Sequence, residues 1–269
     1  MKAGFVQFEP LFGEVNKNIE RAEMLIDGTD ADLLVLPELF NTGYVFTAKG
    51  EVVDLSEEVP KGKTTQALCR MAKNNDVYIV AGIAEKSGDK YFNSAVIVSP
   101  QGYLGTYRKI HLFFEEKLWF NPGDGNFEVY DIGPYKFGVM ICFDWIFPES
   151  MRVLSLKGAY VICHSANLVL PFCQDAMKTR CLENRVFAIT ANRTGTEARK
   201  GKSLTFTGKS QITGHTAEVL YQAAPDTDEV GIVDIDMTRA ENKRLNEYND
   251  IFEDRRTEFY KRLLQDLAE

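Results

Sequence analysis

Short apolar runs without polar alternation recur along the chain. They occupy residues 33–36 (LLVL), 77–82 (VYIVAG) and 137–141 (FGVMI). A run of this kind is typical of a strand that is buried on both faces of a sheet. We therefore predict strands in these runs. Strands are also expected at 2–8, 159–163 and 186–191, and in the two flanks of the hairpin described below.

Stretches with helical periodicity separate these runs. In residues 16–28 the apolar side chains Ile19, Ala22, Leu25 and Ile26 fall on one helical face, and Gly28 ends the pattern. Three more helices are expected at 63–75, 148–157 and 175–185. Strands that alternate with helices predict an α/β fold containing parallel strands.

A hairpin interrupts this alternation near the middle of the chain. Residues 93–98 and 103–108 flank Ser-Pro-Gln-Gly at 99–102, where Pro and Gly mark a β-turn. Residues 210–221 repeat the strand–turn–strand pattern, which indicates a duplicated arrangement of two sheets. No linker divides residues 1–269, so we expect a single domain. The charged and aromatic tail, about 246–269, is expected to be either a solvated surface helix or an arm that packs on a partner subunit.

Composition narrows the classes of partner. The 269 residues are 45% hydrophobic and 26% charged, with a formal net charge of −8. A phosphate backbone is bound by clustered Lys and Arg, so neither nucleic acid nor an anionic membrane is expected as a partner. No apolar stretch reaches the roughly 20 residues of a membrane span.

The chain has five cysteines without a CxxC pair, and its start lacks the shape of a signal peptide. We therefore expect free thiols in the cytoplasm. The three histidines show no zinc spacing, so no metal is expected.

Three reactive side chains follow predicted strands. Glu38 comes after the run at 33–36, Lys109 ends the second arm of the hairpin, and Cys142 directly follows 137–141. Active sites of α/β sheets gather beyond the carboxyl ends of strands. Each residue also has an ordinary interpretation, as a helix-start glutamate, a solvated lysine or an inert buried thiol. The combination of the three is what indicates chemistry.

Cys142 has the most distinctive surroundings. Phe143-Asp144-Trp145 follow it, and Pro148 fits the first turn of a helix. A thiol on such an elbow is expected to be exposed at the tip, where backbone N–H groups favour the thiolate and can hold an oxyanion. Among the other cysteines, Cys69 and Cys181 fall inside predicted helices, Cys163 ends a strand without an elbow, and Cys173 in a loop remains the rival.

The segments around these three residues resemble the signatures of the nitrilase superfamily of carbon–nitrogen hydrolases. They read LPEL at 36–39, YRKIHL at 107–112 and ICFDWIFPE at 141–149, with SAN at 165–167 and ENR at 183–185. The resemblance runs nearly end to end. It implies an α-β-β-α sandwich of two mixed β-sheets flanked by helices, no cofactor or metal, and a homodimer or larger even-numbered oligomer.

The resemblance also implies residue roles. Cys142 would be the nucleophile, Glu38 the general base, and Lys109 the oxyanion stabiliser together with the N–H of Phe143. A second carboxylate follows the lysine in the family, and Glu116, seven positions after Lys109, matches better than Glu115. No histidine lies in a matching motif, so we discount a Cys–His mechanism.

The expected substrate-binding residues are Tyr44, Phe143, Trp145 and Asn167, with Phe46, Phe147 and Phe172 as further aromatic candidates. Such a pocket is narrow, aromatic and poor in cations, which favours a small neutral amide or carbamoyl compound over one with a free carboxylate. A nitrilase is the alternative, although nitrilases commonly carry Trp-Glu after the cysteine, where this chain has Phe-Asp. Acyl transfer to another acceptor, and a catalytically silent binding protein on the same fold, remain open.

Overall fold

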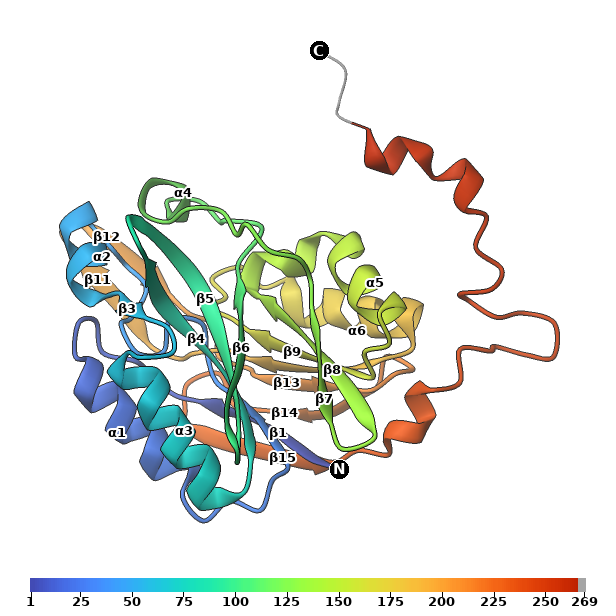
Figure 1. Ribbon diagram of the computed structural model, residues 1–269, viewed down its shortest axis with the longest axis horizontal. Helices are drawn as coiled ribbons and strands as arrows, with labels where there is room; N and C mark the ends of the chain where they lie inside the picture. Colours follow the sequence, from blue (N-terminus) through green and yellow to red (C-terminus); the bar gives the residue numbers. More distant parts are fainter. Residues whose placement is uncertain (266–269) are drawn as a thin grey trace.

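Two mixed β-sheets face each other at the centre of the molecule (Figure 1). The computed structural model describes residues 1–265. The first sheet has the order β15-β1-β2-β4-β5-β6, with β3 beside β4, and the second has the order β14-β13-β10-β9-β8-β7. The strands of the first sheet are β1 Lys2–Gln7, β2 Leu33–Val35, β3 Glu57–Glu58, β4 Tyr78–Ser87, β5 Lys90–Ser99, β6 Gly102–Arg108 and β15 Glu229–Asp234. Those of the second are β7 Val129–Ile132, β8 Tyr135–Ile141, β9 Val161–Ser165, β10 Phe187–Ala191, β13 Gln211–Thr213 and β14 Val219–Gln222.

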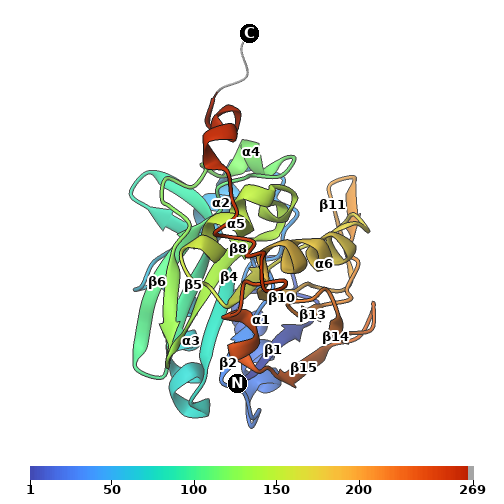
Figure 2. The same ribbon diagram turned by 90° about the vertical axis from the view of Figure 1, so that its right-hand side faces the viewer.

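Helices cover the outer face of each sheet (Figures 1 and 2). Helices α1 (Val15–Ile26) and α3 (Lys63–Asn75) pack on the first sheet, and α5 (Pro148–Leu156) and α6 (Cys173–Asn184) pack on the second. This arrangement confirms the predicted α-β-β-α sandwich. The longest of these helices, α3, has 13 residues, and no helix within residues 1–265 is long and apolar enough to cross a membrane.

The two sheets share one pairing pattern. Read from β15 in the first sheet and from β7 in the second, successive strands pair antiparallel, parallel, parallel, antiparallel and antiparallel. Each sheet therefore contains a central parallel triplet, β1-β2-β4 or β8-β9-β10. The hairpins predicted near residues 100 and 215 are the antiparallel pairs β5–β6 and β13–β14 at the far end of each sheet.

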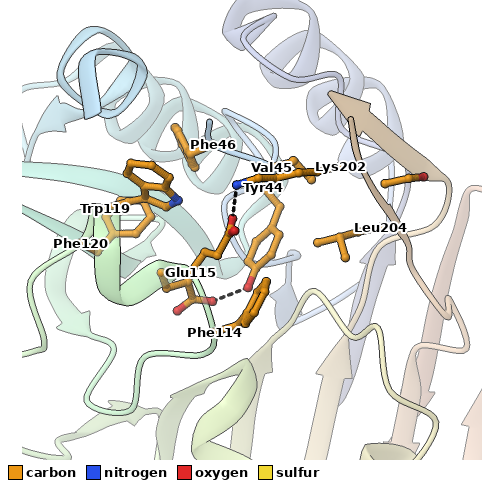
Figure 3. A pocket seen from close by; sticks show the side chains of 11 residues that line it. Tyr44, Val45, Phe46, Phe114, Glu115, Trp119, Phe120, Lys202 and Leu204 are labelled. Atoms are coloured by element: carbon orange, nitrogen blue, oxygen red, sulfur yellow. Dashed lines mark hydrogen bonds and ion pairs between the residues drawn. The ribbon is translucent and has the colours of Figure 1, made fainter. Parts of the chain in front are cut away.

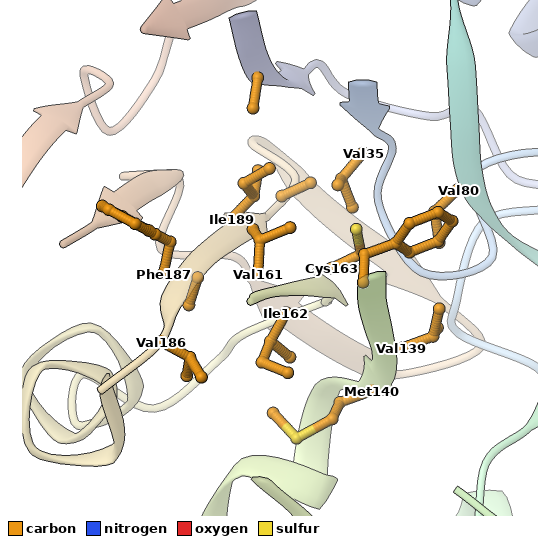
Figure 4. Packing of buried hydrophobic residues seen from close by; sticks show 14 of the residues in the cluster. Val35, Val80, Val139, Met140, Val161, Ile162, Cys163, Val186, Phe187 and Ile189 are labelled. Atoms are coloured by element: carbon orange, nitrogen blue, oxygen red, sulfur yellow. The ribbon is translucent and has the colours of Figure 1, made fainter. Parts of the chain in front are cut away.

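Burial on both faces explains why the central strands lack polar positions. Leu33 and Val35 of β2 point into the core between the sheets, whereas Leu34 points into the core beneath α1 and α3. Figure 4 shows Val35 and Val80 from the first sheet opposite Val161 and Cys163 from the second. Each fully buried aliphatic side chain contributes roughly 1.5–3 kcal/mol to stability. The apolar runs are thus strands shared between two cores.

Several elements differ from the prediction. Strand β4 continues to Ser87 and forms its own hairpin with β5. Strand β9 lies two residues later than predicted, so Cys163 is inside the strand and not at its end. Strands β7 and β15 and the separate pair β11 (Thr196–Arg199) with β12 (Lys202–Thr205) were not predicted either. β7, β11 and β12 have four residues each, too few to show a pattern.

The tail leaves the sandwich and runs along its edge and outward (Figures 1 and 2). Between residues 246 and 265 it forms only two short 3-10 turns, Thr257–Phe259 and Lys261–Leu264. The surface helix, one of the two alternatives for the tail, is therefore absent from this part of the chain, and residues 266–269 lie outside the described residues. An isolated helix needs a packed face to be stable, and here Tyr248 and Leu264 are 82% and 92% exposed.

Candidate active site

The ends of two strands and the start of a short helix bring three of the candidate residues together. Glu38 follows β2, Lys109 directly follows β6, and Glu116 begins the short helix α4 (Glu116–Trp119). The Lys109 ammonium lies 2.6 Å from Glu38 Oε1 and 2.8 Å from the Glu116 carboxylate. All three side chains are buried. The structure therefore forms one cation between two carboxylates, out of contact with bulk water.

Close backbone packing fixes Glu38. The chain after Pro37 runs against β4, where the N–H of Gly82 donates to the Pro37 carbonyl. A Cβ on Gly82 would lie 2.4 Å from the Glu38 Cα, so only glycine permits this approach. Asn93 Nδ2 donates to Glu38 Oε1 at 2.6 Å. Oxygen Oε2 has no hydrogen-bond partner and stays available to accept a proton.

Glu116 is held from three directions. The Tyr44 hydroxyl donates to its Oε1 at 2.6 Å, the N–H of Phe113 donates to its Oε2 at 3.2 Å, and Lys109 supplies the cation. Its neighbour Glu115 instead pairs with Lys202 of β12 near the surface. This difference agrees with the choice of Glu116 over Glu115 from the sequence.

Burial dominates the electrostatics of the cluster. It raises the pKa of Glu38 to about 7, against the opposing effect of the Lys109 charge, and the nearby charge of Glu116 raises that pKa further. Burial also lowers the pKa of Lys109, but the charges of Glu116 and Glu38 more than offset it, so that this pKa lies above its ordinary value. Glu38 thus exchanges a proton near neutral pH beside a lysine that stays charged.

Cys142 lies on a sharp elbow, as the sequence predicted. It follows β8, has a φ of +38°, and begins the 3-10 helix η1 (Cys142–Ile146), after which α5 begins at Pro148. A non-glycine residue in the left-handed region is uncommon and needs support from its surroundings. The Asp144 carboxylate provides part of it, because Oδ2 accepts from the Ile141 N–H at 2.9 Å and from the Tyr107 hydroxyl at 2.7 Å.

The thiol itself differs from expectation. Cys142 is 5% exposed, whereas the elbow predicted an exposed tip. Burial, followed by the charge of Glu38, raises the pKa of the thiol well above its usual value, and Lys109 opposes this only in part. The elbow amides alone therefore do not produce a thiolate. A base must remove the proton when the thiol reacts.

Asn167 joins the two sides of the site. Its side-chain Nδ2 donates to the backbone carbonyl of Glu38 at 2.8 Å, and its backbone carbonyl oxygen lies 3.8 Å from the Cys142 sulfur. A cavity of about 190 Å³ opens beside the sulfur. Its walls are almost entirely apolar, formed by Phe113, Phe143, Trp145, Ile146, Leu168, Val169, Leu170 and Phe172 with Cys142 and Asn167. This set contains three of the four residues expected to bind substrate.

Tyr44, the fourth, borders a different cavity of about 220 Å³ on the Glu116 side (Figure 3). Figure 3 shows its ring between Phe114 and Leu204, with Trp119 and Phe120 nearby. Two other aromatic candidates do not line the cavity at Cys142. Phe46 packs in a core edge-on to Phe120, and Phe147 stacks on His111 at 3.8 Å between ring centroids.

Three polar residues at the site had not been identified from the sequence. Asn93 contacts Glu38, Asp144 supports the elbow, and His164 Nε2 lies 2.9 Å from the Cys142 carbonyl. Polar residues inside otherwise apolar strands are the one signal that could have found Asn93 and His164. Within residues 1–265, no group of three or more His, Cys, Asp or Glu side chains is arranged to hold a metal ion.

Comparisons with known proteins give the family. The sequence model of the carbon–nitrogen hydrolase family matches residues 2–244. A protein of Pyrococcus abyssi named nitrilase is 51% identical over 97% of this chain and 99% of its own length. An (R)-stereoselective amidase of a Pseudomonas species is 33% identical over 95% of this chain and 92% of its own. The crystal structure of a carbon–nitrogen hydrolase from Helicobacter pylori superimposes with a TM-score of 0.90 at 28% identity, covering 100% of this chain and 99% of that one. The chain therefore belongs to the carbon–nitrogen hydrolase family, within the nitrilase superfamily, and is an enzyme of the amidase or nitrilase type.

Proposed function

We propose that this enzyme hydrolyses a small amide or carbamoyl compound through a thioester on Cys142 and releases ammonia. The observation that carries the proposal is the buried Glu38–Lys109–Glu116 cluster beside a buried thiol. An amide carbonyl is a weak electrophile and its nitrogen a poor leaving group. Its hydrolysis needs a nucleophile, a base that later acts as an acid, and a fixed positive charge near the carbonyl oxygen.

In the acylation step, Glu38 Oε2 accepts the thiol proton as the Cys142 sulfur forms a bond to the carbonyl carbon. The π electrons move onto the oxygen, where the N–H of Phe143 and Lys109 stabilise the negative charge. An ammonium group has three donors, and one to each carboxylate leaves the third for the oxyanion. The C–N bond then breaks, and Glu38 returns its proton to the departing nitrogen.

Water completes the cycle. It attacks the thioester carbon while Glu38 accepts one of its protons, and the same two donors hold the second oxyanion. The C–S bond breaks, the sulfur recovers a proton from Glu38, and the acid leaves. A pKa of about 7 suits Glu38 to both roles, because a catalytic acid–base group works best near the operating pH. Glu116 keeps Lys109 in place.

The cavity beside the sulfur supports a small neutral acyl group. None of its lining residues carries a charged side chain, and its volume is about 190 Å³. A free carboxylate in such a cavity would lose its hydration without gaining a partner. The aromatic walls instead favour a short aliphatic or aromatic acyl chain.

Nitrile hydrolysis is the second candidate, favoured by the 51% identical relative that is named nitrilase. The Cys142 sulfur would attack the nitrile carbon in the same way, and the negative charge would then develop on the nitrile nitrogen. The relatives at about one-third identity include amidases. The Phe143-Asp144 pair after the nucleophile also favours the amide.

Paired substrates test both candidates. Purified enzyme is incubated with amides and nitriles that share one acyl chain, and ammonia is measured against Cys142→Ala. Faster release from the amides supports the proposal, and faster release from the nitriles reverses the order. Mass spectrometry under slow turnover identifies the acyl group on Cys142. Added hydroxylamine tests acyl transfer, since a hydroxamate product would reveal an acceptor other than water.

We also propose a homodimer or a larger even-numbered oligomer in which the tail packs on a partner subunit. Apolar side chains on the outer faces of α5 and α6 are exposed, among them Val153, Leu156 and Leu182. The tail exposes Phe259 and Leu263. Light scattering measures the mass in solution, and removal of residues 246–269 is expected to lower it. A monomeric mass of the full chain would contradict this proposal.

A further inference from the structure

A buried histidine contacts the backbone of the nucleophile elbow. His164 lies in β9, next to β8 in the parallel triplet, and is fully buried. Its Nε2 lies 2.9 Å from the Cys142 carbonyl oxygen, and its Nδ1 lies 3.1 Å from the Thr190 hydroxyl on β10. The mechanism proposed above uses no histidine, so this contact needs its own explanation.

The partners define the state of the ring. A carbonyl oxygen only accepts hydrogen bonds, so Nε2 carries the proton and donates to Cys142. Nδ1 is then the acceptor, and the Thr190 hydroxyl donates to it. Burial lowers the pKa of His164 to about 4, so the ring stays neutral at neutral pH. His164 is therefore a fixed donor and does not exchange protons with the substrate.

The geometry of the peptide unit connects this donor to the reaction. The Cys142 carbonyl and the Phe143 N–H belong to the same planar group, which is not among the cis bonds of the chain. In a trans peptide the N–H points opposite to the carbonyl. Whatever holds the Cys142 carbonyl therefore also sets the direction of the Phe143 N–H.

We infer that His164 is a positioning residue: by holding the Cys142 carbonyl, it aims the Phe143 N–H at the oxyanion of the transition state. The inference rests on the proposed acyl-transfer chemistry. Cys142 has a φ of +38° and begins η1, so its carbonyl departs from the course of β8 at the point where the strand ends. Among side chains of residues 1–265, His164 supplies the hydrogen bond to this carbonyl.

The test compares His164→Leu, which removes the donor at similar volume, with His164→Gln, whose Nε2 is also three bonds from Cβ. We expect His164→Leu to lower kcat roughly 10- to 100-fold with little change in KM, since complete loss of an oxyanion donor costs roughly 10²–10³. His164→Gln should recover most of this loss. His215→Leu, at a buried histidine that packs on Phe187, is the matched control and should keep the wild-type kcat.

Alkylation separates this role from a general structural one. Iodoacetamide reacts with the Cys142 sulfur by displacement at a CH₂ group and builds no charge on a carbonyl oxygen. We expect its rate to stay within about threefold of wild type in His164→Leu while amide turnover falls. A parallel fall in both rates, or an unchanged kcat, would overturn the inference. An inactive wild type that is still alkylated would instead contradict the proposed function.

A measurement on the wild-type protein covers the case in which His164→Leu does not fold. Nitrogen-15 NMR of histidine-labelled enzyme should show His164 with its proton on Nε2, unchanged between pH 5.5 and 8. A proton on Nδ1, or titration within that range, would show that Nε2 does not hold the Cys142 carbonyl, and the inference would fail.

Discussion

The two sheets carry different parts of the chemistry although their strands pair in the same pattern. Glu38 and Lys109 follow strands of the first sheet, whereas Cys142 and its elbow follow β8 of the second. The middle strands of the two parallel triplets, β2 and β9, are matched, and the residues just beyond them meet: Asn167 donates to the Glu38 carbonyl.

This difference shows how a repeated framework forms one asymmetric site. Glu38 and Lys109 follow strands of the same sheet and form a direct, buried ion pair. The Cys142 thiol instead lies on the strand-to-helix turn after β8. Neither sheet contains a complete set, and the set becomes complete only where β2 packs on β9 and β5 on β8.

Removing the nucleophile of the second sheet should have the largest effect. We expect Cys142→Ala to abolish turnover and to leave the unfolding temperature near that of wild type, because the thiol holds no structural hydrogen-bond network. Ammonia release and thermal unfolding measure the two quantities. Cys163→Ala is the control, since that thiol lies inside β9 with its pKa raised by burial alone. Residual activity in Cys142→Ala would end the proposed mechanism.

Removing the cation of the first sheet should come next. Lys109→Met is expected to lower kcat by at least roughly 10²–10³, the cost of one oxyanion donor. Unlike Cys142→Ala, it should also destabilise the fold by about 3–5 kcal/mol, because it leaves Glu38 and Glu116 buried without their partner. Urea unfolding measures this. The exposed Lys117 gives the control Lys117→Met, and equal losses in the two variants would contradict the assignment.

Replacing Glu116, the second carboxylate of the cluster, should change the pH profile more than the maximum rate. Activity is expected to rise as Glu38 loses its proton around pH 7 and to fall at alkaline pH, which gives a bell shape for kcat/KM. The charge of Glu116 raises the pKa of Glu38, so Glu116→Gln should move the acidic limb to lower pH. The apparent pKa of the acidic limb belongs to the whole set of interacting groups and not to one residue. Glu115→Gln is the control, and an acidic limb of Glu116→Gln that overlays the wild type would remove Glu116 from the cluster.

The smallest effects should come from the cores, where the sheets are alike. Val35→Ala in β2 and Val161→Ala in β9 each remove two methyl groups from the core between the sheets. We expect each to lower the free energy of unfolding by about 1–3 kcal/mol and to change kcat less than threefold. Chemical denaturation of both variants checks this. A large loss of activity in one alone would show that the sheets also differ in how rigidly they hold the site.

The sequence by itself predicted an α/β fold with strands in the apolar runs, and its family resemblance implied the two-sheet sandwich and named Glu38, Lys109, Glu116 and Cys142 as candidates. It did so because buried strands require continuous apolar runs, and because the signature segments lie at strand ends. The limits of β7 and β15, and the pair β11–β12, could not be predicted. β7, β11 and β12 have four residues each, too few to show a polarity pattern. The pairing of β15 depends on β1 at the other end of the chain.

Only the tertiary structure decided which groups touch. The partners of Glu38 include Asn93, from a strand 55 residues later, and His164 reaches Cys142 from a neighbouring strand. Burial is also a property of the whole fold: it raises the pKa of Glu38 and keeps the thiol protonated where the local elbow predicted a thiolate. Desolvation depends on every atom that surrounds a group, and the linear sequence does not contain that sum.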